Sequence, residues 1–213
     1  MPHARETGTA AQKKSLHASE RDTARVLKAR EQYRETSASL DLERLKFVDE
    51  SGVNLALTRL FGRAPKGQRV VDGVPKNYGD NVTLLGALST AGVEALMSVN
   101  GATDSEVFLV FVREVLSPTL SEGDVVVWDN LGAHRSQAVR EVIEAKGARL
   151  LFLPPYSPDM NPIERCWSKI KTFLRAAKAR SREALDAAIK EALTTVTESD
   201  ARAWFTHCGY TLN

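Results

Sequence analysis

Three acidic side chains lie beside apolar segments of this chain, where a carboxylate is expected to have a partner or a function. Asp129 follows the apolar run at residues 125–128, and Glu164 follows a second apolar run and a proline-rich stretch. Between these two acids lie 34 residues. Asp49 belongs to an alternating segment and shares a face with apolar neighbours. If folding brings the three carboxylates together, they will raise one another's pKa unless cations neutralise them.

Hard oxygen ligands of this kind suit Mg²⁺ or Mn²⁺, with open positions left for water and phosphate. Two such ions about 3.5–4 Å apart can activate a nucleophilic oxygen and stabilise the leaving oxygen during displacement at phosphorus. The chain contains neither the phosphate-binding motif G-x-x-x-x-G-K-[ST] nor the nucleophile-elbow motif G-x-S-x-G. The acids therefore predict metal-dependent chemistry at phosphorus and disfavour a nucleotide triphosphatase.

Each acid also has a plainer structural explanation. Asp129 and Asn130 are favoured residues for an Asx-turn before a helix. Glu164 lies three residues after Asn161, where a capping-box acid belongs, so helix capping would account for it completely. Asp49 could be a solvated acid near the tip of a hairpin. Taken singly, none of the three residues is assigned to a site by its sequence context.

The elements that must position these acids change character along the chain. Alternating segments predict antiparallel strands, first as a hairpin over residues 44–61 with Asp49 near its tip. Further strands are expected over residues 68–74, 81–89 and 93–99. The first half of the fold is therefore expected to be antiparallel.

From residue 104 the hydrophobic period becomes that of a helix, and helices then alternate with uniformly apolar strands. Helices are expected over residues 104–116, 134–147, 161–177 and 181–195, and buried strands over residues 124–129 and 148–154. This order predicts a mixed sheet whose later strands are parallel. Because the 34-residue separation suits one crossover, Asp129 and Glu164 are expected to meet at the carboxyl edge of the sheet.

Composition is ordinary for a soluble globular protein. Charged residues make up 26% and hydrophobic residues 43%, with a formal net charge of +2. No apolar run approaches 18 residues and the N-terminus lacks the hydrophobic core of a signal peptide, so a cytoplasmic location is expected. Cys166 and Cys208 have no CxxC or histidine partner at ligand spacing, and we expect free thiols.

At 213 residues the chain is expected to form one domain of catalytic size with extensions. Residues 1–40 have too few apolar side chains for a core of their own, and we expect a polar tail followed by a linking helix. Residues 41–196 are expected to form the catalytic domain, and residues 197–213 a C-terminal extension.

Seven basic residues and no acid lie between residues 165 and 182. The seven are Arg165, Lys169, Lys171, Arg175, Lys178, Arg180 and Arg182. A solvated helix face is the usual explanation of such a run, but a stretch of one sign leaving the acid site favours contact with a DNA backbone. Such binding would be largely independent of base sequence and would weaken steeply with salt. Trp128, Trp167 and Phe173 are expected to pack in the core rather than to stack on bases.

Four features together resemble one family. They are Asp-Glu-Ser-Gly after a strand at residues 49–52, WDNLGAH at 128–134, LFLPPYSPDMNPIERCWSKIK at 151–171, and the 34-residue gap between the acids. These features resemble the DDE transposases of bacterial insertion sequences related to the mariner superfamily, over roughly residues 42–192. The resemblance implies an α/β, ribonuclease H-like fold with a mixed five-stranded core sheet and helices on both faces.

In that family three acids bind two divalent ions, Mg²⁺ or Mn²⁺, which cut the element's ends and join them to target DNA. Matched residue by residue, the resemblance implies that Asp49, Asp129 and Glu164 are the catalytic and metal-binding triad. It gives Asn130 and His134 a secondary role in shaping the site or holding phosphate. The implied function is that of a metal-dependent DNA endonuclease and strand transferase, with a homo-oligomer forming the synaptic complex. Its location would be cytoplasmic, at the nucleoid when bound to DNA.

Members of the family generally carry an upstream helix-turn-helix region that recognises the element's terminal repeats. The 40 residues before the first strand are too few and too polar to supply it. We therefore expect a separate upstream polypeptide, a frameshift fusion or a truncated copy. Two other functions stay open: a non-catalytic relic that binds DNA or a partner through its basic helix, and a ribonuclease H-like nuclease acting on RNA or a hybrid. The second of these does not account for the PPYSPDMNPIE block.

Overall fold

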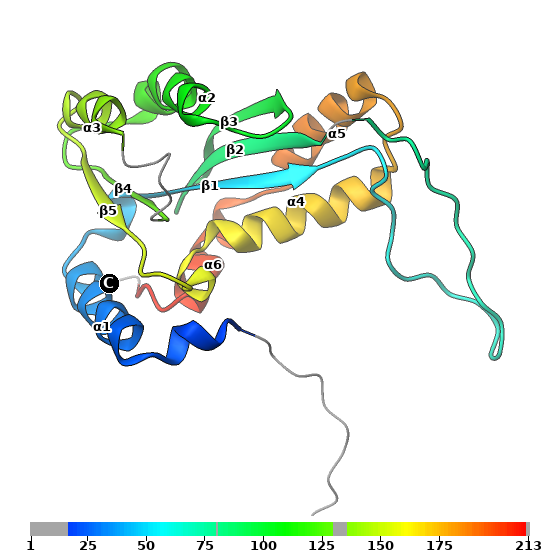
Figure 1. Ribbon diagram of the computed structural model, residues 1–213, viewed down its shortest axis with the longest axis horizontal. Coiled ribbons are helices and arrows are strands. Elements are labelled where there is room, and N and C mark those ends of the chain that lie inside the picture. Colours follow the sequence, from blue (N-terminus) through cyan, green and yellow to red (C-terminus); the bar gives the residue numbers. More distant parts are fainter. Residues whose placement is uncertain (1–16, 80, 130–135, 212–213) are drawn as a thin grey trace, which may run out of the picture.

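A five-stranded mixed sheet forms the centre of the computed structural model, which describes residues 17–79, 81–129 and 136–211 (Figure 1). The strands are β1 (Leu45–Val53), β2 (Val82–Ser89), β3 (Gly92–Asn100), β4 (Val125–Trp128) and β5 (Arg149–Phe152), in the spatial order β3-β2-β1-β4-β5. β1, β2 and β3 pair antiparallel, whereas β4 runs parallel to β1, and β5 runs parallel to β4. The predicted mixed sheet with parallel later strands is confirmed.

Helices cover both faces of this sheet (Figure 1). On one face lie α2 (Ser105–Val110), which continues as a π-helical segment over Phe111–Leu116, and α3 (Gln137–Glu144). On the other face lie α4 (Ile163–Ala177), α5 (Arg182–Thr194) and α6 (Glu198–His207). Because successive strand residues point to opposite faces, Phe47 packs into the core on the α4 side and Val48 into the core on the α2 side. The expected helices on both faces are therefore confirmed.

α4 positions the third acid, and its pattern explains how. Its buried residues are Ile163, Cys166, Trp167, Ile170 and Leu174, spaced three or four apart along one side. This apolar stripe packs on β1 and β2 from below, so the first turn of α4 lies close to the middle of the sheet. Glu164 is on that first turn.

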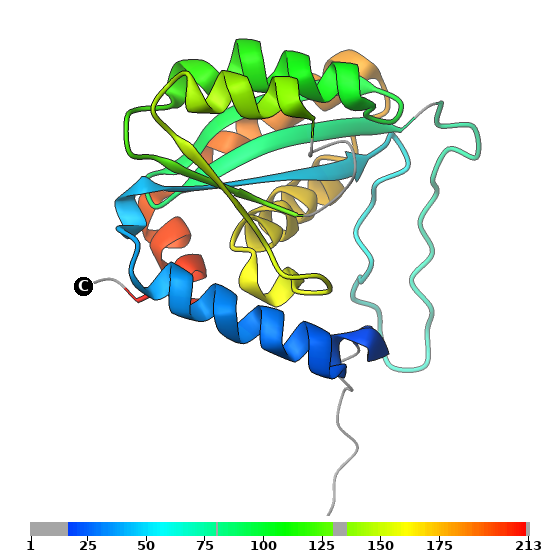
Figure 2. The ribbon, with the colours of Figure 1, turned by 60° about the vertical axis from the view of Figure 1, so that its left-hand side comes forward.

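The expected hairpin over residues 44–61 is wrong. β1 runs straight through Ser51 and Gly52 to Val53, and the strand antiparallel to it is β2, with Val53 opposite Val82. The chain between these strands forms a long arm (residues 54–79) that projects from the molecule (Figures 1 and 2). The strand expected over residues 68–74 lies in this arm and is absent from its described residues. The alternation of apolar and polar residues in the arm did not produce strands, because the arm projects from the molecule and its apolar side chains have no sheet face to pack on.

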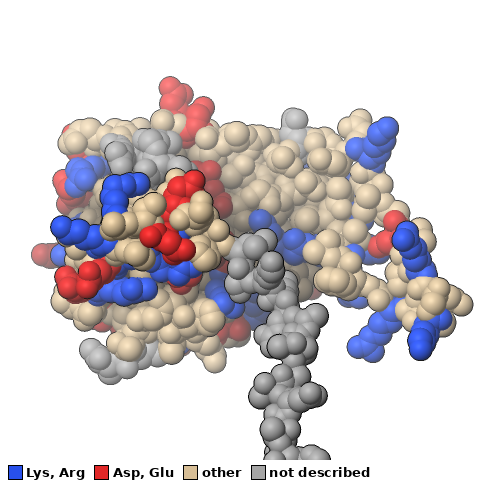
Figure 3. All heavy atoms as spheres, turned by 60° about the horizontal axis from the view of Figure 1, so that its bottom comes forward, with Lys and Arg blue, Asp and Glu red and all other residues tan. Residues whose placement is uncertain are grey.

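The arm is basic and exposes apolar side chains. Its described residues carry five exposed cations, Arg59, Arg63, Lys66, Arg69 and Lys76, and one acid, Asp72. Figure 3 shows blue side chains gathered on this projecting part. Phe61 is 90% exposed and Val71 89% exposed. An arm of this composition suits contact with an anionic or apolar partner.

β5 is less buried than expected. The apolar run at residues 148–154 predicted a strand covered on both faces, but Arg149 is exposed and the other three strand residues are only partly buried. The reason is the strand order, because β5 is at the edge of the sheet and has a single neighbour, β4. None of the helices in the described part of the chain is long and apolar enough to span a lipid bilayer.

Candidate active site

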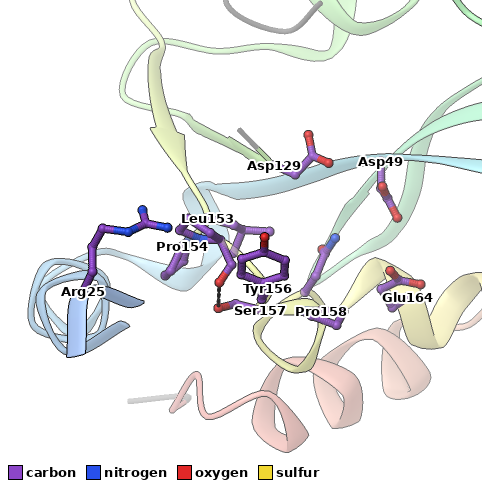
Figure 4. Close-up of a pocket in the computed structure, with 11 residues that line it drawn as sticks. Arg25, Asp49, Asp129, Leu153, Pro154, Tyr156, Ser157, Pro158 and Glu164 are labelled. Atoms are coloured by element: carbon purple, nitrogen blue, oxygen red, sulfur yellow. Dashed lines mark hydrogen bonds between the residues drawn. The ribbon is translucent and has the colours of Figure 1, made fainter. Parts of the chain in front are cut away.

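The structure places Asp49, Asp129 and Glu164 around one open pocket of about 450 Å³. Asp49 comes from the middle of β1, Asp129 follows the last residue of β4, and Glu164 is in the first turn of α4. In Figure 4 the carboxylates of Asp49 and Glu164 point toward one another, and Asp129 lies beside them. The three acids that the sequence singled out, distant along the chain, thus line the same pocket.

The surroundings of the pocket shift the pKa values of Asp49 and Glu164. Burial raises the pKa of Asp49 to about 7, and the negative charges of Glu164 and Asp129 add to this shift. Partial burial by the pocket walls also raises the pKa of Glu164, although this residue is open to solvent and Lys171 opposes the shift. A raised pKa means that the negative charge of the carboxylate is disfavoured in this pocket. A bound cation would stabilise that charge.

The donor set fits a hard divalent cation, since it consists of carboxylate oxygens. Within the described residues, however, no three such side chains already stand at the spacing of a single metal centre. Asn130 and His134, the two secondary site residues, lie outside the described residues.

Trp167 contributes to this site in a way that the sequence did not reveal. It was expected to be a core residue, and it is, with 3% of its surface exposed. Its indole Nε1 also donates a hydrogen bond of 3.1 Å to Oδ2 of Asp49. The available signal was its position three residues after Glu164, which puts the two side chains on neighbouring positions of one helix. Trp128 is fully buried and Phe173 packs against the core, as expected.

Glu164 is not used in a capping box. Pro162 precedes the first residue of α4, and no side chain caps this helix end. The N–H of Glu164 donates to the carbonyl of Asn161, three residues earlier, as in the tight turn that often begins a helix. The side-chain Oδ1 of Asn161 is buried and has no hydrogen-bond partner among the described residues. Capping thus does not account for Glu164, whose carboxylate lines the pocket instead.

The loop that joins β5 to α4 forms the floor of the pocket. The pocket is lined here by five consecutive residues, Leu153, Pro154, Pro155, Tyr156 and Ser157 (Figure 4). Tyr156 has a φ of 54°, a left-handed conformation that is uncommon for residues other than glycine. The hydroxyl of Ser157 donates to the carbonyl of Pro155 at 3.0 Å. Prolines and this local bond give the loop one shape, which sets the direction in which α4 begins.

α1 (Ala24–Ala38) holds this loop from outside. Figure 2 shows the helix running beneath the loop. Arg30 is 2% exposed and donates to Ser157 Oγ at 2.7 Å and to the two carboxylate oxygens of Asp159 at 3.0 and 2.7 Å. The Arg30 guanidinium holds the pKa of Asp159 below its usual range. Because planar two-point contacts of this kind fix geometry, α1 is part of the pocket's support.

Two tyrosines complete the support. The hydroxyls of Tyr33 and Tyr210 are 2.8 Å apart, and Tyr210 donates to the carbonyl of Met160 at 2.8 Å. Arg25 of α1 reaches the far end of the pocket from the acids (Figure 4). Sequence reasoning missed Arg25 and Arg30 because basic residues on a polar helix are ordinarily solvated.

Most of the seven basic residues already have partners in the protein. Lys169 pairs with Asp200 and Lys178 with Asp72, each at 2.6 Å. Arg182 pairs with Asp186, Arg180 donates to the carbonyls of Leu55 and Leu57, and Arg165 contacts His207. Within the described residues, Lys171 and Arg175 are the two of the seven without a hydrogen bond or ion pair. They follow Glu164 along the same side of α4, at steps of seven and eleven residues.

The two cysteines are free, as expected. Cys166 belongs to α4 and is buried in the core, and burial raises the pKa of its thiol to about 12. Cys208 is partly buried, and burial raises its pKa to about 11. The raised pKa favours the neutral thiol over the reactive thiolate in both residues.

Comparison with known proteins places this site in a family context. Residues 44–186 match the family model described as DDE superfamily endonuclease. The chain is similar to the Tcb2 transposase of Caenorhabditis briggsae, with 28% identity over 143 residues that cover 62% of this chain and 52% of the relative. It is also similar to the Tc1 transposase of Caenorhabditis elegans, with 26% identity over 113 residues that cover 51% and 41%. The chain thus spans about half the length of the curated relatives it matches.

Solved structures of Mos1 transposase share the fold. The catalytic domain of Mos1 mariner transposase matches with a TM-score of 0.61 at 16% identity, covering 91% of this chain and 89% of that chain. The Mos1 mariner paired-end complex with Mn matches with a TM-score of 0.73 at 17% identity, covering 96% and 64%. Other matching Mos1 complexes contain Mg or the left transposon end. At this identity the likeness shows the fold alone, and it confirms the expected ribonuclease H-like architecture.

Proposed function

The chain belongs to the DDE superfamily of endonucleases, and from this we propose that it is the catalytic domain of a transposase related to the mariner and Tc1 enzymes. It would cleave DNA at the ends of a mobile element and transfer those ends to target DNA. The observation that carries the proposal is the convergence of Asp49, Asp129 and Glu164 on one pocket from three separate elements. We assign the catalytic role to residues 41–196, with the flanking segments as supporting extensions.

The proposed cofactor is a divalent cation, Mg²⁺ or Mn²⁺, bound as two ions by the three acids. The raised pKa of Asp49, caused by burial and by the charges of Glu164 and Asp129, supports this, and so do the Mg and Mn named for the Mos1 complexes. Two such ions would activate the attacking oxygen and neutralise charge on the leaving oxygen. The protein's own residues do the rest: the acids orient the ions, and the proline-rich loop fixes Glu164 relative to β1 and β4.

A supercoiled plasmid tests the activity without requiring recognition of element ends. Purified protein with Mn²⁺ or Mg²⁺ is expected to nick or join this DNA, and chelation by EDTA is expected to stop both reactions. The alternative, a non-catalytic relic, finds some support in the open spacing of the acids. It predicts salt-sensitive DNA binding with no metal-dependent change in the plasmid, and that result would reject the enzymatic proposal.

DNA would reach the acids along the side of α4 that carries Lys171 and Arg175. Because the other five basic residues of this stretch are engaged within the protein, these two are the best candidates for phosphate contact. Arg25, at the opposite end of the pocket, would meet the strand where it leaves. The DNA path thus crosses the acids between two cationic ends.

Replacing both Lys171 and Arg175 with Ala is expected to weaken DNA binding and to lower the slope of log affinity against log salt by about 2, since each lost phosphate contact removes about 0.9. Fluorescence anisotropy with labelled DNA at several salt concentrations measures this slope. A matched control replaces Arg113 and Lys146, which are exposed on the α2 and α3 side of the sheet. Equal slopes for the two double variants would contradict the proposed DNA path.

We propose that the active form is a homo-oligomer that pairs two element ends. The projecting arm supports this, because Phe61 and Val71 are almost fully exposed in the single chain and a second copy would cover them. Analytical ultracentrifugation with end DNA tests the oligomeric state. A protein that sediments only as a monomer on DNA would be inconsistent with this part of the proposal.

Recognition of specific element ends is assigned to another polypeptide or to a frameshift fusion that carries a helix-turn-helix. The described part of the N-terminal segment supports this, because α1 is occupied in holding the pocket loop. We further propose that the element is a bacterial insertion sequence and that the protein acts in the cytoplasm, at the nucleoid. Inverted repeats and an overlapping upstream frame in the flanking DNA are the observations to seek; their absence would count against this origin.

A further inference from the structure

We propose that Trp167 is a positioning residue that holds the carboxylate of Asp49 ready for a divalent cation, and that Gly86 is required because it makes room for the indole ring. This inference rests on the proposed function, since it concerns the metal-binding acids. Neither Trp167 nor Gly86 belongs to the acidic triad or to the basic residues discussed above.

The hydrogen bond joins two elements that each supply an acid. Trp167 is one helical turn after Glu164 on α4, and its Nε1 donates to Oδ2 of Asp49 on β1 at 3.1 Å. The indole therefore fixes the distance between the strand of one acid and the helix of another. A carboxylate has about four acceptor sites, so Asp49 keeps others for an ion in the pocket that it lines.

Burial makes this contact specific. With 3% of its surface exposed, Trp167 is largely shut off from bulk water, and its indole N–H needs an acceptor within the protein. The acceptor is a carboxyl oxygen of Asp49, and this hydrogen bond would strengthen when the carboxyl is ionised, as it would be with a cation in the pocket. Core packing alone would not require this partner, since any apolar side chain of similar size fills the same space.

Gly86 lies directly opposite Asp49 in the β1 and β2 pairing. A Cβ at position 86 would lie 2.7 Å from Cη2 and 3.2 Å from Cζ2 of Trp167. Because the ring is enclosed by the core, it could accept a methyl group only by moving away from β2. Because Gly86 has no side chain, the indole ring of Trp167 fits against β2 at this position and its N–H reaches Asp49.

The first experiment measures ion binding directly, without DNA. Free Mn²⁺ is followed by electron paramagnetic resonance during titration of the wild type and of Trp167→Phe, which removes the N–H but keeps an aromatic ring. We expect the dissociation constant for Mn²⁺ to rise about tenfold or more, as for other partners that orient metal ligands. Trp204→Phe is the matched control, since Trp204 packs at the edge of the same core on α6. Equal affinity in the Trp167 and Trp204 variants would overturn the proposal.

A double-mutant cycle tests whether Gly86 acts through Trp167. Gly86→Ala alone is expected to weaken Mn²⁺ binding about as much as Trp167→Phe does. In the combined variant the shorter phenylalanine leaves room for the methyl group, so the second change should add little. If the losses of Mn²⁺ affinity in the two single variants simply add in the combined variant, Gly86 and Trp167 act independently. The role proposed for Gly86 would then be rejected.

A spectroscopic measurement follows the same contact in the wild type and uses a variant only to assign one signal. The chain has three tryptophans, and their indole N–H signals can be followed by ¹H–¹⁵N NMR during titration with Mg²⁺. We expect the Trp167 signal, assigned by its loss in Trp167→Phe, to shift saturably and more than the other two. Saturable Mg²⁺ binding with an unmoved Trp167 signal would refute the inference and leave the proposed function intact. A wild type that binds neither Mn²⁺ nor Mg²⁺ would instead reject the proposed function itself.

Discussion

Asp129→Ala is expected to lose metal-dependent DNA cleavage and joining by about 10³-fold or more, the scale seen when one member of a catalytic group is removed. Asp129 follows β4, a central strand buried at every position, so its carboxylate is held at the edge of the sheet beside Asp49 and Glu164. Without it, two carboxylates remain, too few to hold two ions in place. Cleavage of a supercoiled plasmid in Mn²⁺, measured as initial rate, gives the comparison.

The fold of this variant is expected to survive, because Asp129 follows β4 rather than belonging to it, and the charge removed is one that raises the pKa of Asp49. Circular dichroism and thermal unfolding check this. Glu50→Gln is a suitable control, since Glu50 follows Asp49 on β1 and points to the opposite face of the sheet. Wild-type cleavage rates in folded Asp129→Ala would exclude the assignment of the triad.

Asp49→Asn is expected to make the metal-free protein more stable at pH 8 while abolishing its activity. The pKa of Asp49 is raised from 3.8 to about 7, chiefly by burial and then by the charge of Glu164. A shift of about three pKa units corresponds to at most about 4 kcal/mol, so a gain of about 2–4 kcal/mol is expected from removing the charge. Asparagine keeps an oxygen that can accept from Trp167.

The direction of the pH dependence follows from proton binding. Between pH 4 and pH 7 the folded wild type keeps a proton on Asp49 that the unfolded chain has lost, so wild-type stability falls as pH rises through this window. Below pH 4 both states are protonated, and the stability advantage of Asp49→Asn should disappear. Above pH 7 the advantage should have its full value.

Urea unfolding in EDTA, at several pH values from 4 to 8, measures the difference between the two proteins. Added Mg²⁺ should stabilise the wild type at pH 8 and narrow the gap, because it binds the charged carboxylate that the variant lacks. An advantage of Asp49→Asn that stayed constant across this pH range would show that burial of the charge is not its source. Such an exchange of stability for function is common among catalytic residues.

Several features of the fold follow from local sequence. The run at residues 125–128 predicted β4 because a strand buried on both faces needs an apolar side chain at every position. The proline-rich stretch and the apolar spacing after it predicted α4, and the 34-residue separation suited one crossover between parallel strands. These sequence patterns depend on a few neighbouring residues, and the elements that they predicted are present in the structure.

Other features depend on partners that local sequence does not name. Alternation around Asp49 suited either a turn at Ser51 and Gly52 or a strand that continues, and pairing with β2 selected the second. Arg30 belongs to a polar helix, and its burial results from Ser157 and Asp159, more than a hundred residues away in the chain. Side-chain type alone would have placed it in solvent.

By itself the sequence determined which groups are available for chemistry, the order of the later elements, and the side of each element on which the three acids lie, because side-chain periodicity is a local property. Only the tertiary structure decided that β1 pairs with β2, that α1 holds the pocket loop, and that Trp167 reaches Asp49 across 118 residues of chain. Those contacts come from packing of whole elements against one another, in which burial and the need to pair buried polar groups select partners that are distant in sequence.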